Sequence, residues 1–490
     1  MEPLKNEGEA YRKITAVLKR RRKPATIADI TAATALPLSL VRELLPRAAD
    51  EFSGRLEVTE SGEIRYSFPR GFTSRYRGFK AGLKRFGNNF FTFMGAAGSL
   101  LFKVWIMVML IGYFVLFLAI AIGGLFLSVA AQSKNSNGRR QSTVYAGSGI
   151  FNMIWRLWFY SELTRSYQRY DGRVSRADKA PSRPMHKAIF SFVFGEADPN
   201  RNLAESEHKA LIAYIQAHRG VISLPEFMAF TGKNSAEAEE AIIAFCAEFG
   251  GSPEATDEGT IVYRFDELLL RDDTQRFAEL SPSIQRLRQF SANPKSMNIW
   301  FIIINAVNLF FGSYFLYHSF TTGLLYTVEQ FQAASFLYGF TYSLFMNFQS
   351  NPLPFISIVL GVIPLVFSLL FWLVPALRSH AEKKENDNIR LRNFKRLGFS
   401  RIWSRPLQLA SGDIEASAEE CRPHNLNAAR EQVIKEMGAW SVPEVEINSQ
   451  GATVYSFTEL EREKQALEKY RAGVDPARTD LGKTVFDSGA

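Results

Sequence analysis

Apolar side chains dominate two long runs in the second half of the chain. The first reads IWFIIINAVNLFFGSYFLY and the second reads FISIVLGVIPLVFSLLFWLVPAL. Glu329 is the single ionised side chain between Lys295 and Arg378. A helix needs about 20 mostly apolar residues to cross the hydrocarbon of a bilayer. The pattern therefore predicts an integral membrane protein with transmembrane segments at 299–318 and 355–377.

Two other regions border or precede these runs. A third apolar run covers 93–131, and its core at 104–131 contains no charged side chain. That core is long enough for one tilted crossing. The segment 146–187 is aromatic and basic and contains Arg156, so we expect it to lie at the membrane interface. The segment 319–353 is expected to be an apolar loop or a re-entrant segment.

The number of crossings before the second polar region has two solutions. If the polar regions before and after each apolar block share one face of the membrane, each block crosses an even number of times. Either 93–131 is then a bent hairpin, or 149–162 returns through the membrane. The sequence leaves open whether 104–162 crosses once or twice.

Outside the apolar blocks, one order of elements occurs three times, at 10–69, 205–268 and 388–460. Apolar positions at helical spacing come first, and two alternating strands around a glycine turn follow. In the third region a short helix is expected at 413–421. Helices followed by a hairpin are the order of a winged helix. The predicted fold class is an α-helical membrane protein with about three winged-helix-like α+β domains on the cytoplasmic side.

The last strand of each region carries the pattern Gly-x-x-x-Tyr-x-Phe. The glycine is expected to turn the hairpin, and Tyr and Phe fall on one face at period two. The pattern favours internal repetition, and three unrelated helix–hairpin modules are the alternative. Its residues are Gly62, Tyr66 and Phe68; Gly259, Tyr263 and Phe265; and Gly451, Tyr455 and Phe457.

The net charge is +9, and its distribution is more informative than its sum. Basic clusters flank the apolar segments: a juxtamembrane linker at 70–92, the end of 146–187, and the residues after Leu377. Such flanks indicate the cytoplasmic side of the cell inner membrane and attract anionic lipids. Nucleic acid is a less favoured partner, because 205–268 holds 12 acidic and 4 basic side chains. Residues 461–490 are expected to form a C-terminal tail.

Few residues suggest chemistry. The two cysteines, Cys246 and Cys421, are too few for a disulfide framework or a cysteine-rich metal site. The first 15 residues lack an apolar run, so no secretory signal peptide is expected. We expect no catalytic residues, no metal and no cofactor.

Two sets of polar residues are candidates for a site. The string FGEADPN contributes Phe194, Gly195, Glu196, Asp198, Pro199 and Asn200. Its carboxylates could hold a cation or a basic partner; the favoured interpretation is a turn that ends a helix. The second set is intramembrane or borders the membrane: Asn305, Asn308, His318 and Glu329. Such groups can mark an ion path or bond a neighbouring helix.

These features together resemble a known family. FGEADPN, then EGTIVYRF, then paired apolar spans and a basic NIRLRNFKR helix are similar to an uncharacterised family of multi-pass membrane proteins of cyanobacteria and plant chloroplasts. The resemblance covers roughly 100–460, and residue 197 is alanine where glycine is expected. It implies a layout and no established activity. Some plant members are labelled as iron–sulfur cluster biogenesis proteins, and two cysteines give that label no support.

The resulting functional hypothesis is a non-enzymatic membrane protein. It would act as a scaffold or regulator through protein partners of its winged-helix-like domains, with membrane lipids as further partners. The alternatives are a membrane-tethered DNA-binding regulator and a transporter or channel component. The sequence does not identify the partner, the physiological process or the oligomeric state.

Overall fold

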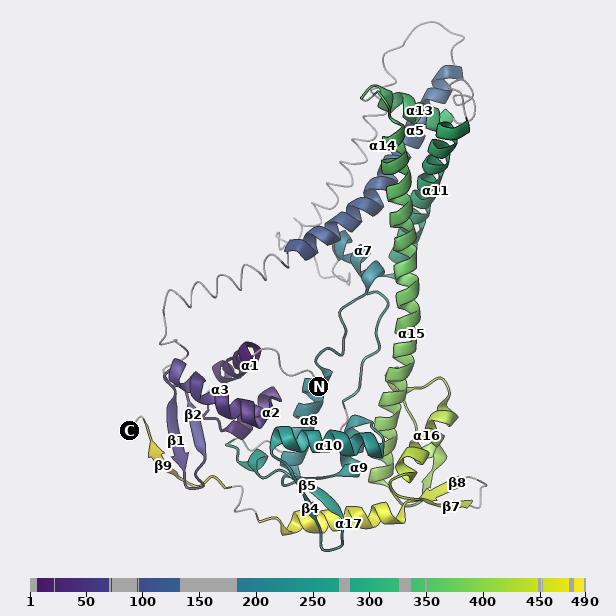
Figure 1. Cartoon of the computed structure of the whole chain (residues 1–490). Helices are drawn as coiled ribbons and strands as arrows, with labels where there is room; N and C mark the ends of the chain where they lie inside the picture. Colours follow the sequence, from purple (N-terminus) through teal and green to yellow (C-terminus); the bar gives the residue numbers. More distant parts are fainter. Residues whose placement is uncertain are drawn as a thin grey trace, which may run out of the picture. The chain divides into compact units, whose positions relative to one another are not determined.

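The computed structural model describes most of the chain, which folds into two compact units (Figure 1). The described residues are 7–21, 23–69, 72, 95, 97–132, 183–272, 283–325, 336–348, 350–447, 451, 453–475 and 480–488. We call the first unit the modular unit; it comprises Met1–Arg85, Asp198–Arg288 and Lys384–Ala490. We call the second the apolar-helix unit; it comprises Phe86–Ala197 and Gln289–Lys383. The fold is mostly helical with small antiparallel sheets.

Module 1 of the modular unit has three helices and a hairpin. Its elements are α1 (Glu7–Arg20), α2 (Ile27–Thr34), α3 (Leu38–Glu51), β1 (Arg55–Thr59) and β2 (Ile64–Ser67). Helix α2 starts at Thr26, whose hydroxyl accepts from the N–H of Asp29 while the Asp29 carboxylate accepts from the N–H of Thr26. This reciprocal cap satisfies two backbone donors at the helix start.

Module 2 repeats this order with a short extra strand. Its elements are α8 (Leu203–Ala217), β3 (Val221–Ser223), α9 (Leu224–Thr231), α10 (Ser235–Phe249), β4 (Ser252–Ala255) and β5 (Ile261–Arg264). Ser223 and Glu226 form the cap of α9, and Gly232 ends that helix at a φ of 70°. The strand β5 lies between β3 and β4.

Module 3 begins with the last turns of the long helix α15 (Ile363–Ser404). It continues with β6 (Leu409–Ala410), α16 (Leu426–Gly438), β7 (Glu444–Ile447) and β8 (Thr453–Ser456), and β8 lies between β6 and β7. The expectation of a short helix at 413–421 is wrong: two 3-10 turns, Ser411–Asp413 and Glu419–Cys421, lie there instead. The carbonyl of Ile414, which in a helix would accept from residue 418, instead accepts from the guanidinium of Arg430 at 3.0 Å.

The end of the chain forms two more elements of the modular unit. Helix α17 (Thr458–Gly473) follows module 3, and β9 (Thr484–Asp487) pairs antiparallel with β1 of module 1. The sheet of module 1 therefore has the strand order β2-β1-β9. Arg471 of α17 donates to the carbonyl of Val221 at 2.8 Å and to the buried carboxylate of Glu226 at 2.7 Å. The sequence predicts a tail at 461–490. In the structure, α17 instead contacts module 2 and β9 pairs with module 1.

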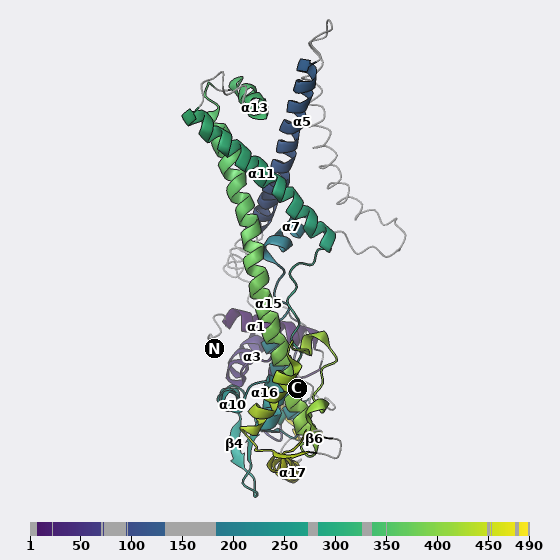
Figure 2. The same ribbon diagram turned by 90° about the vertical axis from the view of Figure 1, so that its right-hand side faces the viewer.

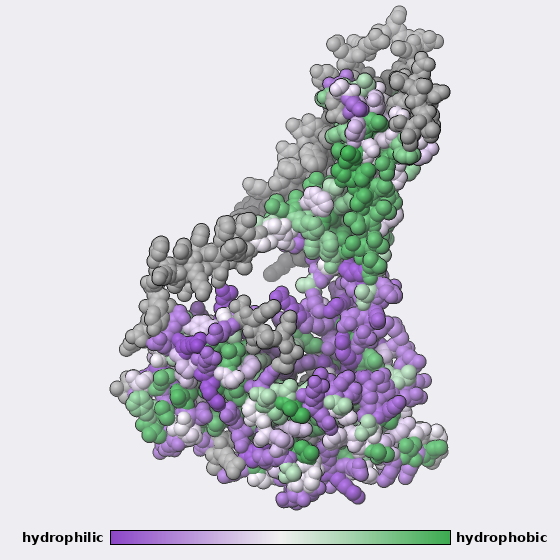
Figure 3. Space-filling model, in the orientation of Figure 1, coloured by the Kyte–Doolittle hydropathy of each residue, from purple (hydrophilic) through white to green (hydrophobic). Residues whose placement is uncertain are grey.

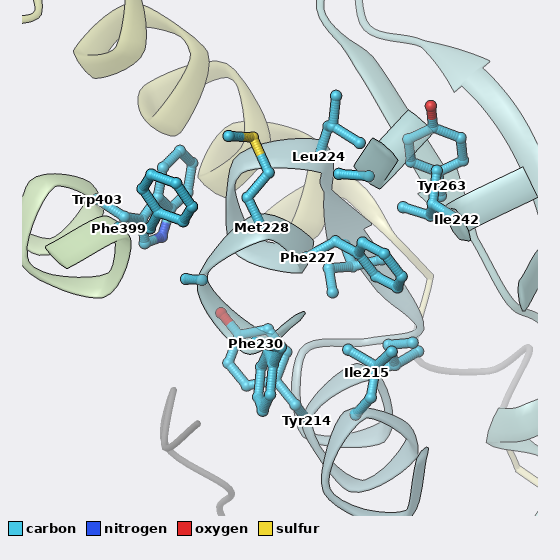
Figure 4. Packing of buried hydrophobic residues seen from close by; sticks show 14 of the residues in the cluster. Tyr214, Ile215, Leu224, Phe227, Met228, Phe230, Ile242, Tyr263, Phe399 and Trp403 are labelled. Atoms are coloured by element: carbon cyan, nitrogen blue, oxygen red, sulfur yellow. The ribbon is translucent and has the colours of Figure 1, made fainter. Parts of the chain in front are cut away.

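Modules 2 and 3 share one hydrophobic core. Phe399 and Trp403 of α15 belong to the same buried cluster as Phe227 and Met228 of α9 (Figure 4). Leu38 at the start of α3 belongs to this cluster, and Ile27 and Ala32 of α2 pack against it, whereas the other core residues of module 1 form a separate cluster. Because burial of apolar surface is the main favourable term in folding, a shared core makes modules 2 and 3 one cooperative body.

Among the described residues, three helices that lie wholly or partly in the apolar-helix unit are long and apolar enough to cross a bilayer (Figure 2). They cover Ala97–Phe126, Lys295–Thr322 and Leu353–Ser404. The first contains the π-helical turn η1 (Val108–Gly112) and runs into α5 (Tyr113–Gln132), and the second is the start of α11 (Lys295–Leu325). The third joins α14 (Leu353–Phe355), the π-helical turn η3 (Ile356–Val362) and α15. Apolar side chains gather on the visible face of this unit (Figure 3). Leu369, Leu370 and Leu373 of α15 are each more than half exposed.

Two shorter apolar helices of this unit lie within the described residues. The first is α7 (Met185–Phe194), and the second is α13 (Phe336–Met346) within the segment expected to be a loop or re-entrant. At 1.5 Å per residue, α13 is about 16 Å long, roughly half the hydrocarbon thickness. Leu337 and Phe340 of α13 lie against Gly123 and Gly124 of α5. Most of 146–187, including the possible returning segment 149–162, lies outside the described residues.

Candidate functional site

The FGEADPN string begins where α7 ends, in the apolar-helix unit. Phe194 is the last residue of α7, and Gly195 adopts a φ of +83°. A Cβ at Gly195 would lie 2.6 Å from Nη1 of Arg378. Both the left-handed backbone and the close approach of Arg378 require glycine here.

Arg378 closes the end of α7. Its guanidinium donates to the carbonyls of Phe192 at 2.8 Å and Val193 at 3.2 Å, which are free at the helix terminus. It also donates to the carbonyl of Phe290 at 2.8 Å and lies 4.2 Å above the centre of the Phe290 ring. Glu382, one helical turn further along α15, pairs with it at 2.6 Å. One arginine thus holds α7, the chain at Phe290 and α15 together.

Glu196 is bound within the same unit. It accepts two hydrogen bonds from Arg183, one of them at 2.9 Å, and another from the hydroxyl of Ser191. The hydrogen bond from Arg183 is the main cause that lowers the pKa of Glu196 to about 2, against the opposing effect of its partial burial. Glu196 is therefore an ionised, paired carboxylate at neutral pH.

The rest of the string belongs to the modular unit. Asp198 pairs with Arg288 at 2.7 Å, and its other oxygen accepts from the N–H of Asn200 at 2.9 Å. The Asn200 amide donates to the carbonyl of Arg286 at 2.7 Å and accepts from the N–H of Arg286 at 2.8 Å. The Asn200 side chain thus pairs with both backbone groups of Arg286, as a neighbouring β-strand would.

Two asparagines of α15 repeat this contact along the same segment, residues 283–288, which we call the strap. Asn386 bonds the N–H and the carbonyl of Arg288 at 2.8 and 2.9 Å, and Asn393 bonds those of Gln285 at 2.9 Å each. Residues 386 and 393 are seven positions apart, about 10 Å along a helix. An extended chain covers about 10 Å in the three positions from 285 to 288. The two spacings match, so the strap is fixed in register on α15.

Arg396 fixes the first residue of the strap and is itself buried. It donates to the carbonyls of Ser283 and Thr231 and to the carboxylate of Glu207. Its exposed fraction is 3%, so its charge depends on these partners. The polar residues of the string and the strap are thus bonded to the chain itself, which favours the interpretation of FGEADPN as a turn over that of a cation site.

The polar candidates of the apolar runs differ in their burial and in their hydrogen bonds. Asn305 and Asn308 are fully buried in α11, and their amides donate to the carbonyls of Ser368 at 3.0 Å and Leu110 at 2.7 Å. Within the part of the chain that the structure describes, their Oδ1 atoms have no hydrogen-bond partner. His318 lies ten positions further along α11, about 15 Å away, with its ring centre 4.5 Å from that of Tyr314. Glu329 lies outside the described residues.

The two π-helical turns supply carbonyls for these bonds. Leu110 lies in η1, and Val359 of η3 accepts from the hydroxyl of Tyr113 at 2.9 Å. A π turn displaces the regular i to i−4 pattern and so makes carbonyls available to side chains. Gly312 and Gly361 allow the close contact beside them: a Cβ on either would lie 3.0–3.1 Å from backbone atoms of the other helix. Neither Tyr113 nor the π turns gave a signal in the sequence.

The Gly-x-x-x-Tyr-x-Phe residues occupy corresponding places in the three modules. Gly62, Gly259 and Gly451 all have φ between 77° and 84°. Each signature tyrosine pairs on one side with the hairpin partner strand and on the other with the short segment after the first helix. The pairs are Leu56 and Ala25 for Tyr66, Pro253 and Ile222 for Tyr263, and Val445 and Leu409 for Tyr455. Phe265 and Phe457 are fully buried, and Phe68 is partly buried against Phe72.

A groove of about 640 Å³ lies in the modular unit beside α17. Trp440, Glu463 and Lys469 contribute to its walls, together with the hairpin residues 258–261 of module 2. Burial raises the pKa of Glu463 to about 7, although the indole N–H of Trp440 donates to its carboxylate at 2.9 Å. The sequence gave no indication of this group.

The described architecture is thus that of a mostly helical protein with three candidate membrane-spanning helices and three small sheets. The chain is 25% identical over 391 residues to the uncharacterized chloroplastic protein At5g03900 of Arabidopsis thaliana. The aligned residues cover 78% of this chain and 70% of the relative. This similarity is consistent with the plant and chloroplast part of the family resemblance. The cyanobacterial part and the FGEADPN motif of that resemblance stay predictions. No family model matches the chain, and no solved structure matches it.

Proposed function

We propose that this protein is a non-enzymatic, multi-pass integral membrane protein that acts as a scaffold or regulator through protein contacts of its modular unit. The observation that carries the proposal is the path of residues 458–488. This segment leaves module 3, binds Glu226 of module 2 through Arg471, and pairs with β1 of module 1. A unit tied together in this way presents its surfaces in a fixed arrangement, as a scaffold must.

The modules are winged-helix-like repeats in this proposal. Three observations support it: the shared order of helices and hairpin, the central place of the last strand in the sheets of modules 2 and 3, and the equivalent register of the three tyrosines. DNA binding has less support. Helix α3, the counterpart of a DNA-recognition helix, uses Arg42 to pair with Glu267 of module 2 at 2.9 Å. Helix α10 of module 2 carries acidic side chains and no base.

The membrane in this proposal is the cell inner membrane, with the modules on its cytoplasmic side. Lys and Arg residues gather at 70–92 and after Leu377, as cytoplasmic flanks do. The exposed leucines of α15 suit contact with lipid tails. The Arabidopsis relative is chloroplastic by name, which is stated of that protein alone.

Photo-crosslinking from α10 in native membranes tests the scaffold role. Ile243 is 64% exposed, and Glu239 and Glu240 beside it are exposed as well. A photoreactive residue at position 243 of the full chain is expected to give a discrete adduct with a partner protein. The additional substitution Glu240→Lys should reduce that adduct, because it reverses a charge at the contact. A smear identical to that from a residue placed at the lipid-facing Leu370 would contradict the proposal.

A transport or channel role is the second candidate. It is favoured by the buried Oδ1 atoms of Asn305 and Asn308, which have no partner among the described residues. Buried acceptors among spanning helices can line an ion path. Ion flux in proteoliposomes that contain the wild-type protein is expected to equal that of empty liposomes if the scaffold role is correct. A flux that Asn308→Leu abolishes would establish transport instead.

A further inference from the structure

The outer edge of β1 in module 1 is occupied by a segment that lies more than 400 residues further along the chain. Glu57 pairs with Asp487 and Val58 with Phe486 in an antiparallel ladder, which shifts register before Thr59. The backbone N–H of Glu60 donates to the carbonyl of Lys483 at 3.0 Å, and the N–H of Ser488 donates to that of Leu56 at 2.9 Å. The occupied edge thus extends from Leu56 to Ser61.

Most of the contact is made by main-chain atoms. The side chains of Val485 and Phe486 are 69% and 59% exposed, and Leu481 is the buried apolar side chain of the segment. Backbone pairing along an exposed strand edge is largely independent of sequence. The edge of β1 therefore has the properties of a general acceptor for an extended segment.

Specificity comes from two places at the ends of the contact. Arg55 makes two hydrogen bonds to the Asp487 carboxylate, the bidentate geometry in which arginine selects an acid. Six positions earlier, Leu481 is buried and its carbonyl accepts from the N–H of Ser61 at 3.3 Å. Gly482 lies between them at a φ of +67°, and a Cβ there would lie 2.5 Å from Glu60. A segment that binds to this edge thus needs an apolar residue at the position of Leu481, a glycine at that of Gly482 and an acid at that of Asp487.

We propose that the β1 edge is a strand-acceptor site for an extended protein segment with this chemistry, and that residues 481–488 are its ligand within the same chain. A partner segment of the same kind would bind in trans by replacing the tail. This interaction surface goes beyond the proposed scaffold role and does not depend on membrane insertion, so each can fail without the other.

The test uses the full chain with a specific protease site inserted between residues 475 and 480. After folding and purification in detergent, cleavage frees the tail from its covalent link. A fluorescent peptide of residues 478–490 is then added, and its anisotropy is measured. We expect saturable binding that unlabelled peptide competes away, and release of the original tail on gel filtration.

Two matched variants separate specific docking from nonspecific adhesion. The peptide with Asp487→Lys should bind at least about tenfold more weakly, because it loses the bidentate pair. The affinity of the Asp487→Lys peptide should recover with a protein that carries Arg55→Glu, because the charge pair is then restored in the opposite sense. The peptide with Val485→Ser should bind like the wild type, since that side chain points to solvent. Equal binding of the Asp487→Lys and wild-type peptides, or no saturable binding at all, would overturn the proposal.

A second measurement covers the case in which the cleaved protein does not stay folded. In the intact chain, hydrogen exchange of 55–60 is expected to accelerate in Asp487→Lys and to return to the wild-type rate in the Arg55→Glu, Asp487→Lys double variant. Unchanged exchange in the single variant would show that the tail does not occupy this edge in solution, which also overturns the proposal.

Discussion

Asn393 binds the backbone of Gln285 with both atoms of its side-chain amide, at 2.9 Å in each direction. The same amide also donates to the carbonyl of Glu420 at 2.8 Å. Asn393 is fully buried, so water cannot replace these partners. One side chain therefore holds the strap against α15 and against the segment that precedes α16 in module 3.

Replacement of this amide should loosen the strap. Asn393→Ala leaves the N–H and carbonyl of Gln285 without their partner, which should cost about 2–4 kcal/mol. We expect faster hydrogen exchange at 283–288 and a lower melting temperature of the full chain. Asn388→Ala is the matched control, because Asn388 is exposed on the same helix. Equal exchange rates in the two variants would contradict the role of Asn393.

The FGEADPN turn should depend on its glycine. Gly195→Ala places a Cβ 2.6 Å from Arg378 in a backbone conformation with φ of +83°. The strain should be about 1–3 kcal/mol from the backbone alone, with a further loss if Arg378 is displaced from the carbonyls of Phe192 and Val193. Thermal unfolding in detergent measures the change. Gly98→Ala should have no such effect, since no atom of the described residues lies within 4 Å of its added Cβ. A similar loss of stability in both variants would contradict the role of Gly195.

The contact between α11 and η3 should be intolerant of larger residues. A Cβ at Gly361 would lie 3.1 Å from the Cα of Leu316, and a backbone atom cannot move aside as a side chain can. Gly361→Val should therefore destabilise the apolar-helix unit by about 1–3 kcal/mol. The melting temperature in detergent is the readout. Gly339→Val in α13 serves as the control, because the space around that glycine is open; an unaffected Gly361→Val variant would show that the helices are not in contact there.

The stability of the modular unit should fall as pH rises from about 4.5 to 7. Burial raises the pKa of Glu463 to about 7 from its ordinary value of 4.5, and the nearby Glu226 adds to this effect. The folded state then binds a proton that the unfolded state has lost, so ionisation favours unfolding across that interval. The contribution is up to about 3 kcal/mol. Glu463→Gln keeps an acceptor for Trp440 and should flatten the profile; a profile that is unchanged by this substitution would exclude Glu463 as its source.

The long-range features of the fold had no counterpart in local sequence patterns. Uninterrupted apolar runs sufficed to predict the three long helices, and glycines before alternating residues sufficed to predict the hairpins. The segment at Thr484–Asp487 has no alternation that would identify its partner, because β1 lies at the other end of the chain. The strands β3 and β6 were missed for another reason: three and two residues are too few to show a period.

The sequence singled out the candidate residues but not the side chains that contact them. The FGEADPN residues were found because their composition is unusual after an apolar helix. Their arginine partners are distant in sequence, and nothing local pointed to Arg378 or Arg288. Asn305 and Asn308 stood out as polar residues in an apolar run, whereas Tyr113 gave no signal, since a tyrosine in such a run is ordinary.

Cysteine accessibility in intact cells tests most directly whether the apolar helices cross the membrane with the modules on one side. Ser350 lies between α13 and α14, and Ser417 is an exposed residue of module 3. The native Cys246 and Cys421 are buried, so the wild-type protein provides the background. With a membrane-impermeant maleimide, Ser350→Cys should be labelled in intact cells, and Ser417→Cys only after permeabilisation. Labelling of both positions before permeabilisation, or of neither, would contradict the account.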